Sequence, residues 1–132
     1  MTNHVARGRA SENAVRDELG GYGYDVLRSA GSKGAADLIA IGDGFAVLVQ
    51  VKLGEHGKPF QMPSPSERQQ LLRLSGRLGN AIAVAACRVP GAGARPAVTA
   101  YRVLTGPGPK DWQGWGPGAG RVPYPEIGVA AR

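Results

Sequence analysis

Three polar residues of different chemistry stand at the ends of two neighbouring apolar segments. Asp37 lies near the start of the segment 36–41, and Gln50 and Lys52 end the segment 45–52. Alternate residues of a strand share a face, so Gln50 and Lys52 are expected to project together. A tight turn between the segments would bring Asp37 across from them. An acid, an amide and a lysine would then converge, with oxygen atoms that can hold a hard cation beside an ammonium group that can stabilise negative charge.

Each of these residues, taken singly, also has a structural explanation, and singly that explanation is favoured. Asp37 could simply start a strand, Lys52 could extend along the surface at a strand end, and Gln50 could satisfy a backbone group. Several other conspicuous residues are interpreted as structural. Arg73 and Arg77 are expected on a solvent-exposed helix face, and Trp112 and Trp115 are expected to pack. Cys87 is expected in the core, and His4 and His56 are expected to have no role.

The apolar pattern predicts the elements that must position the cluster. A first helix is expected over 5–19, with Glu12 on the same face as Val15 and Leu19, and the glycine-rich run 20–23 should end it. Three strands are expected at 24–28, 36–41 and 45–52. Asp43-Gly44 is a strong hairpin signal between the last two strands.

A capping box from Ser64 to Glu67, with Pro65 at the first helical position, predicts a second helix that runs to about residue 78. Its buried stripe is expected at Leu71, Leu74 and Leu78. Two further strands are expected at 81–87 and 98–104. The order α-β-β-β-α-β-β predicts an α/β fold with a mixed central β-sheet flanked by helices.

One domain is expected over residues 1–105, followed by a Gly/Pro-rich C-terminal extension over 106–132. The extension holds five prolines and seven glycines, too many for a regular element. Its aromatic residues nevertheless argue against a wholly disordered tail. We expect it to pack irregularly on the domain or on a partner subunit.

Composition narrows the class of protein. The 132 residues suffice for one domain with a real core, and neither an apolar run of membrane-spanning length nor a secretory signal is seen. A single cysteine and two histidines predict no disulfide and no structural zinc. The net charge of +6 resides in the second half, with nine basic and three acidic side chains over 67–132. A polyanionic partner, most commonly a nucleic acid, is favoured over solubility alone.

The arrangement resembles a known group of enzymes, the PD-(D/E)XK nucleases, and most of all the archaeal-type Holliday junction resolvases. The resemblance covers about residues 8–85 and rests on Glu12, then Arg28-Ser29-Ala30-Gly31-Ser32-Lys33-Gly34, then Asp37, then Gln50-Val51-Lys52. Taken together and in this order, the residues favour a functional role over the separate structural explanations given above for Asp37, Gln50 and Lys52. Two positions depart from the pattern: Ala36 stands for a proline, and Gln50 for a carboxylate, which removes one negative charge from the metal site.

The resemblance implies a restriction-endonuclease-like core and hydrolysis of phosphodiester bonds with Mg²⁺, for which Mn²⁺ can substitute. It implies catalytic roles for Glu12, Ser32, Asp37, Gln50 and Lys52. The metal would be held by Asp37, with Gln50 and a backbone carbonyl near Val51 as secondary ligands and Glu12 as an outer carboxylate. Lys52 would orient or deprotonate the attacking water. DNA phosphates would be bound by Arg7, Arg9, Arg28, Ser32 and Lys33.

The resulting hypothesis is a structure-selective endonuclease that resolves four-way DNA junctions. It would act as a homodimer, because two symmetric nicks need two active sites related by a two-fold axis. No membrane and no small-molecule cofactor are expected, and the compartment would be the cytoplasm of a bacterial or phage-infected cell. Two alternatives stay open: another PD-(D/E)XK endonuclease that cuts flaps or duplex ends, and a DNA-binding module whose cleavage is impaired by Gln50.

Overall fold

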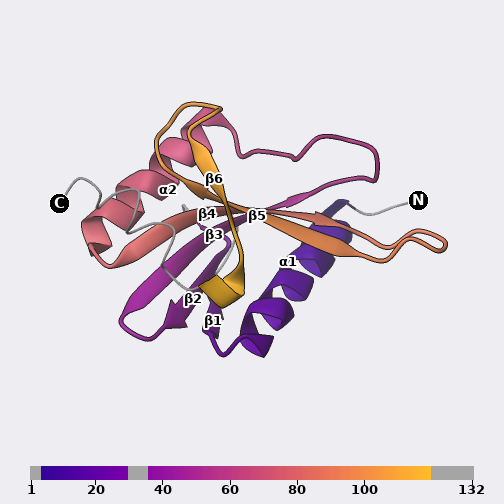
Figure 1. The fold of residues 1–132 in the computed structure, drawn as a ribbon, viewed down its shortest axis with the longest axis horizontal. Coiled ribbons are helices and arrows are strands. Elements are labelled where there is room, and N and C mark those ends of the chain that lie inside the picture. The colour runs from indigo at the N-terminus through magenta and orange to yellow at the C-terminus, as the bar shows by residue number, and fades with distance from the viewer. Residues whose placement is uncertain (1–3, 30–35, 120–132) are drawn as a thin grey trace.

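The computed structural model describes residues 4–29 and 36–119. Its elements follow the predicted order, with one strand more at the end (Figure 1). They are α1 (His4–Gly21), β1 (Asp25–Arg28), β2 (Leu38–Gly42), β3 (Phe45–Leu53), α2 (Pro65–Leu78), β4 (Ala81–Val89), β5 (Val98–Leu104), β6 (Trp112–Trp115) and the 3-10 turn η1 (Pro117–Ala119). α1 ends at Gly21, inside the glycine-rich run that was predicted to stop it and two residues beyond the predicted end at residue 19.

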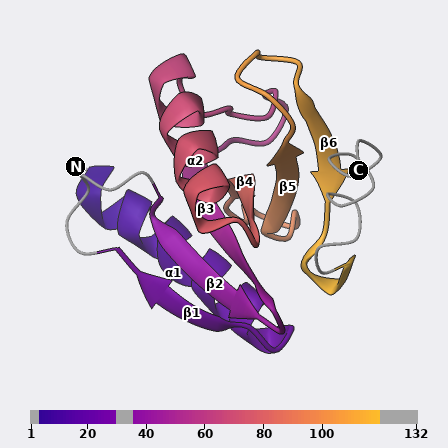
Figure 2. The same ribbon diagram turned by 90° about the vertical axis from the view of Figure 1, so that its left-hand side faces the viewer.

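The six strands form one sheet in chain order, from β1 at one edge to β6 at the other (Figure 2). β3 and β4 are parallel, and every other neighbouring pair is antiparallel. A parallel pair needs a crossover connection, and α2 lies within it. The predicted α/β fold with a mixed central sheet is confirmed.

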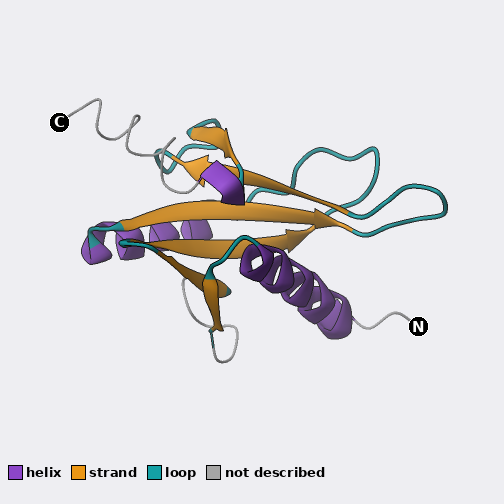
Figure 3. Cartoon of the chain, turned by 60° about the horizontal axis from the view of Figure 1, so that its bottom comes forward, coloured by secondary structure: helices purple, strands orange, loops and turns teal. Residues whose placement is uncertain are grey.

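The side chains of β3 alternate between two apolar layers on opposite sides of the sheet, as the sequence predicted. Figure 3 shows the strands with one long helix in front of them and the other behind. Val47 and Val49 face α1 and pack with Val15 and Leu19, whereas Leu48 faces α2 and packs with Leu71. Because β3 is covered on both faces, its apolar run is unbroken until Gln50. The polar residues at its end are therefore held by a buried strand.

The capping box predicted at the start of α2 is present, with Ser64 as N-cap and Pro65 within the first turn. Leu71 is fully buried, but Leu74 is half-buried and Leu78 is 55% exposed, so the predicted leucine stripe was wrong at its end. Leu78 is the last residue of the helix, where no element covers it. The buried residues of α2 are Arg68, Leu71 and Ser75, and the partly buried Leu72 and Leu74 also pack on the apolar layer under the helix.

The layer under α2 combines small and large side chains. Ala81, Ala83 and Ala85 of β4 lie in it together with the fully buried Leu48, Leu71 and Leu104. The buried Arg68 donates to the carbonyls of Pro63 (2.7 Å) and Pro107 (2.9 Å). These bonds tie the first turn of α2 to the loops on either side of it.

The prediction that residues 106–132 contain no regular element was wrong for Trp112–Ala119. β6 pairs with β5 and extends the sheet, and η1 follows it. The glycines and prolines form a compact turn before β6, in which Asp111 Oδ2 accepts from the Gly108 N–H (2.9 Å). A Cβ on Gly106 or Gly108 would collide with the Asp111 side chain, so glycine is required by close approach and does not signal disorder. The remainder, 120–132, lies outside the described residues.

The two tryptophans have the packing role that was predicted. Trp115 is 7% exposed and meets the Tyr101 ring edge-on, with ring centroids 5.6 Å apart. Trp112 stacks on the guanidinium of Arg102, whose other side faces Phe60. Arg73 and Arg77 are exposed and Cys87 is buried, also as predicted.

Replacing Trp115 with alanine is expected to lower the free energy of unfolding by about 3 kcal/mol, the cost of removing a large buried aromatic side chain. Urea denaturation followed by circular dichroism measures the change. Trp112→Ala is the matched control and should cost less, because Trp112 is only half-buried. Equal stability of Trp115→Ala and the unmodified protein would contradict the docking of β6 on the sheet.

Among the described residues, no helix has the length and apolar character needed to cross a membrane.

Candidate active site

Asp37 lies directly before β2, at the end of the β2–β3 hairpin that is far from the turn. Its backbone N–H donates to the Val49 carbonyl (2.8 Å), and its Oδ2 accepts a hydrogen bond from the Val51 N–H (2.9 Å). Because Leu38 is paired with Val49, the next position on each strand sets Asp37 opposite Gln50. The structure thus brings these two residues together across the hairpin.

Gln50 and Lys52 project from β3 on the face covered by α2. Gln50 is 9% exposed, whereas about a third of the Lys52 side chain is in contact with solvent. Lys52 Nζ lies 2.9 Å from Glu67 Oε1 and 3.1 Å from Glu67 Oε2. The amide Nε2 of Gln50 donates to the same Oε2 at 3.4 Å. An ammonium, an amide and a carboxylate therefore share one cluster at the end of β3.

Glu12 approaches from α1. Its Oε1 lies 3.8 Å from Arg28 Nε, and Arg28 also donates to Asn13 Oδ1. Arg28, which was predicted to bind DNA phosphates, is therefore partly engaged by α1. Arg9 is exposed on the same helix. The Arg7 side chain, Ser32 and Lys33 lie outside the described residues.

The carboxylates around Asp37 repel one another. Burial raises the pKa of Asp37, the Val51 N–H and the Lys52 ammonium oppose this rise, and the Glu67 carboxylate adds to it. The pKa of Glu12 is also raised, first by burial and then by Asp37, while Arg28 and Arg9 act in the opposite direction. A cation at this place would relieve the repulsion and keep the acids ionised.

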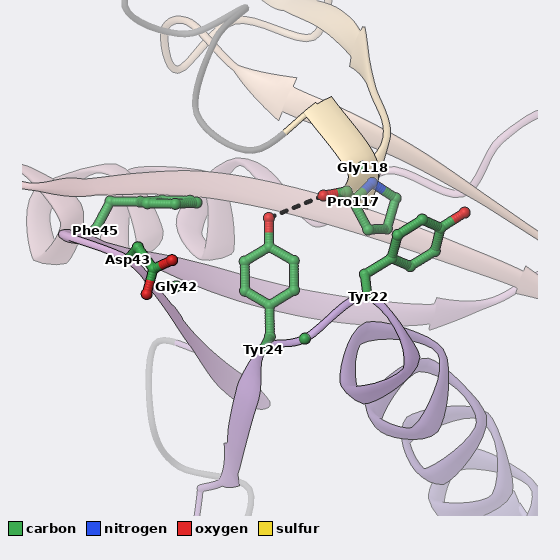
Figure 4. Close-up of a pocket in the computed structure, with 8 residues that line it drawn as sticks. Tyr22, Tyr24, Gly42, Asp43, Phe45, Pro117 and Gly118 are labelled. Carbon is green, nitrogen blue, oxygen red and sulfur yellow. Dashed lines mark hydrogen bonds between the residues drawn. The ribbon is translucent and has the colours of Figure 1, made fainter.

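An open pocket at the other end of the hairpin is not part of this cluster. Tyr22, Tyr24 and Phe45 line it with the turn residue Asp43, and the Tyr24 hydroxyl donates to the Pro117 carbonyl (3.0 Å; Figure 4). Its described lining carries one carboxylate and no basic side chain. The arrangement offers no set of groups comparable to that at the ends of β2 and β3.

Comparison with known proteins supports the fold. No protein-family model matches the chain, and no curated protein matches it. Among solved structures it is similar to Hjc, a Holliday junction resolvase from the archaeal hyperthermophile Archaeoglobus fulgidus, with 25% identity and a TM-score of 0.53 over 74% of this chain and 70% of that one. The protein has a restriction-endonuclease-like fold. Hjc belongs to the PD-(D/E)XK nuclease superfamily, and the likeness supports a nuclease of this kind.

The candidate site offers oxygen donors for a divalent metal, but few of them are charged. Within 4–29 and 36–119, no three His, Cys, Asp or Glu side chains lie close enough to hold a metal ion by themselves. The remaining donors are the Asp37 carboxylate, the amide oxygen of Gln50 and the Val51 carbonyl. Mg²⁺ is usually held by one or two carboxylates together with waters and substrate phosphates. This sparse donor set fits Mg²⁺ whose coordination is completed by substrate.

Sequence reasoning missed Glu67 as a member of this cluster. The residue was identified as the N3 member of the capping box, and that role is present, with the Ser64 N–H donating to Oε1 (2.8 Å). What the pattern did not reveal is that the first turn of α2 lies over the end of β3. The neutral Gln50 did indicate that the cluster was short of negative charge, but the sequence did not indicate which acid would supply it.

Proposed function

We propose that the protein is a divalent-metal-dependent DNA endonuclease that resolves four-way junctions. The observation that carries the proposal is the meeting of Asp37, Gln50 and Lys52 at one end of the β2–β3 hairpin, within a fold shared with a Holliday junction resolvase. The basic net charge of +6 suits a DNA backbone as partner.

Asp37, the Gln50 amide oxygen and the Val51 carbonyl would hold Mg²⁺ or Mn²⁺, with Glu12 as an outer carboxylate. The bound metal supplies charge neutralisation at the phosphate and lowers the pKa of a coordinated water. Lys52 would orient or deprotonate the attacking water, and its ammonium charge would stabilise the transition state at the phosphate. Ser32 assists at the phosphate, and Arg7, Arg9, Arg28 and Lys33 hold neighbouring phosphates, which positions DNA without specifying sequence.

The proposed assembly is a homodimer acting in the cytoplasm of a bacterial or phage-infected cell. Resolution of a four-way junction needs two nicks of opposite strands, and a two-fold axis supplies two equivalent active sites in the required relation. A rigid dimer with two clefts would engage several arms of one junction together.

Binding is expected to be tighter to a four-way junction than to linear duplex of equal length. Affinity that depends on phosphate contacts should fall with salt at a slope of roughly 0.9 per contact, whereas the preference for the junction should persist at moderate salt. A gel-shift competition in which labelled junction is challenged with unlabelled junction or duplex measures both effects. Equal displacement by the two competitors would reject junction selectivity and favour an endonuclease for flaps or duplex ends.

A DNA-binding module without cleavage is the second candidate. It is favoured by the neutral Gln50 and by the ion pair that occupies Lys52. Incubation of a junction with Mg²⁺ or Mn²⁺ separates the two candidates, because the module would retain binding and yield no nicked product.

A further inference from the structure

The acid on α2 stands beside the two residues of β3 on which the proposed chemistry depends. We propose that Glu67 is a positioning residue that supplies, from the helix, the negative charge that Gln50 does not provide on the strand. In this role it holds the Lys52 ammonium and fixes the orientation of the Gln50 amide. This inference rests on the proposed nuclease function and deepens it.

The contacts of Glu67 use both of its carboxylate oxygens. Oε1 accepts from the Ser64 N–H (2.8 Å) and lies 2.9 Å from Lys52 Nζ. Oε2 accepts from Lys52 Nζ (3.1 Å) and from Gln50 Nε2 (3.4 Å). The ammonium is thus held by both oxygens, which restricts a side chain that is otherwise long and flexible.

The hydrogen bond to Gln50 also decides which end of the amide faces the cluster. Because Nε2 donates to Glu67, the amide oxygen points away from that carboxylate and remains available as an acceptor. Gln50 is almost fully buried and lies opposite Asp37, and the opposite orientation of the amide would set its oxygen against the Glu67 carboxylate. A divalent cation at Asp37 would find an oxygen donor there rather than an NH₂ group.

The Glu67 carboxylate is linked to Asp37 through Gln50. It accepts from the Ser64 N–H at Oε1 (2.8 Å) and from Gln50 Nε2 at Oε2 (3.4 Å), and Gln50 lies opposite Asp37 on the paired strands. A cation near Asp37 would therefore be attracted by two carboxylates from different elements, one on the hairpin and one on the helix.

Helix capping does not by itself account for an acid at this position. Glutamine serves equally at N3 of a capping box, because capping needs only a side-chain oxygen that accepts from the N-cap N–H. The negative charge is used by Lys52 and Gln50. The first turn of α2 is also rigid, since Arg68 is bonded to the carbonyls of Pro63 and Pro107, so the carboxylate is presented from a fixed position.

The test moves the negative charge from position 67 on the helix to position 50 on the strand, in the full-length protein. Glu67→Gln removes the charge and keeps the cap, and it should reduce cleavage of a four-way junction roughly 10- to 100-fold, the range of a hydrogen bond to a charged group. Mn²⁺ affinity, measured by electron paramagnetic resonance without DNA, should fall as well. The double variant Gln50→Glu/Glu67→Gln restores one carboxylate to the cluster and should regain most of both properties.

Controls separate this role from general effects of charge and stability. Glu55→Gln removes the same charge from an exposed loop position and should leave cleavage and Mn²⁺ affinity unchanged. Circular dichroism should give equal melting temperatures for Glu67→Gln and the unmodified protein. Unchanged Mn²⁺ affinity in Glu67→Gln, or a double variant as defective as Glu67→Gln, would overturn the inference. If the unmodified protein binds Mn²⁺ but cuts no DNA, the proposed nuclease function fails, and the Mn²⁺ measurements still decide the role of Glu67.

Discussion

Asp37→Asn is expected to reduce DNA cleavage by about 1000-fold or more, because it removes the charged ligand on which the proposed metal site depends. Asparagine has the shape of aspartate, and its amide oxygen can still accept the hydrogen bond from the Val51 N–H. The hairpin should therefore keep its register, and DNA binding should be retained, since phosphate contacts are made by other residues. Single-turnover cleavage of a labelled junction, with a gel shift on the same samples, measures the two properties separately.

A matched control for this substitution lies at the opposite end of the same hairpin. Asp43 is exposed in the β2–β3 turn, far from Gln50 and Lys52, and Asp43→Asn should cleave at the unmodified rate. Full cleavage by Asp37→Asn, at any Mg²⁺ concentration, would remove Asp37 from the site.

Lys52→Met is expected to reduce cleavage roughly 100- to 1000-fold, the effect of deleting one charged donor that stabilises a transition state. Methionine preserves the apolar stem of the side chain, so packing at the end of β3 is maintained. Little stability should be lost with the Glu67 ion pair, because a pair that is about one third exposed contributes little. The cleavage rate under saturating enzyme reports the chemical step, and the melting temperature reports the fold.

Lys110→Met provides the comparison for lost positive charge. Lys110 is exposed in the turn before β6, and its replacement should leave the cleavage rate as it is. A Lys52→Met protein that cleaves like Lys110→Met would show that the ammonium of Lys52 serves only the ion pair with Glu67.

Local sequence patterns predicted most of the fold, because strands, turns and helix caps depend mainly on residues that are close together in the chain. The residues on each face of β3 were predicted from the alternation of side chains along a strand, and the two faces do pack in different layers. The Asp43-Gly44 turn fixed which residues of β2 and β3 are paired. These two features were enough to bring Asp37 to Gln50. The position of α2 above the end of β3 depends on contacts between distant segments, and no spacing within the chain encodes it. Glu67 was missed for that reason.

The C-terminal segment shows the opposite error. Its many glycines and prolines predicted broken structure, yet Gly106 and Gly108 are needed for a close turn around Asp111. The signal for β6 was weak, because a strand of four residues offers little alternation and the cue lay in the two tryptophans. The glycine and proline content of this segment therefore predicted the turn before β6 correctly, but it did not predict the strand β6.

The site is formed by two kinds of contact. One lies within the β2–β3 hairpin, and the other joins β3 to the helix in the crossover to its parallel neighbour β4. Asp37 and Gln50 are joined by a hairpin, whose short loop closes at little entropic cost. Lys52 meets Glu67 only when α2, which lies in the crossover 54–80 between the parallel strands β3 and β4, has docked on the sheet. Local opening of α2 would release Lys52 and the Gln50 amide while Asp37 stayed bonded to Val51. The half of the site that carries the ammonium thus depends on the docking of a helix, whereas the half that carries Asp37 depends on the hairpin alone.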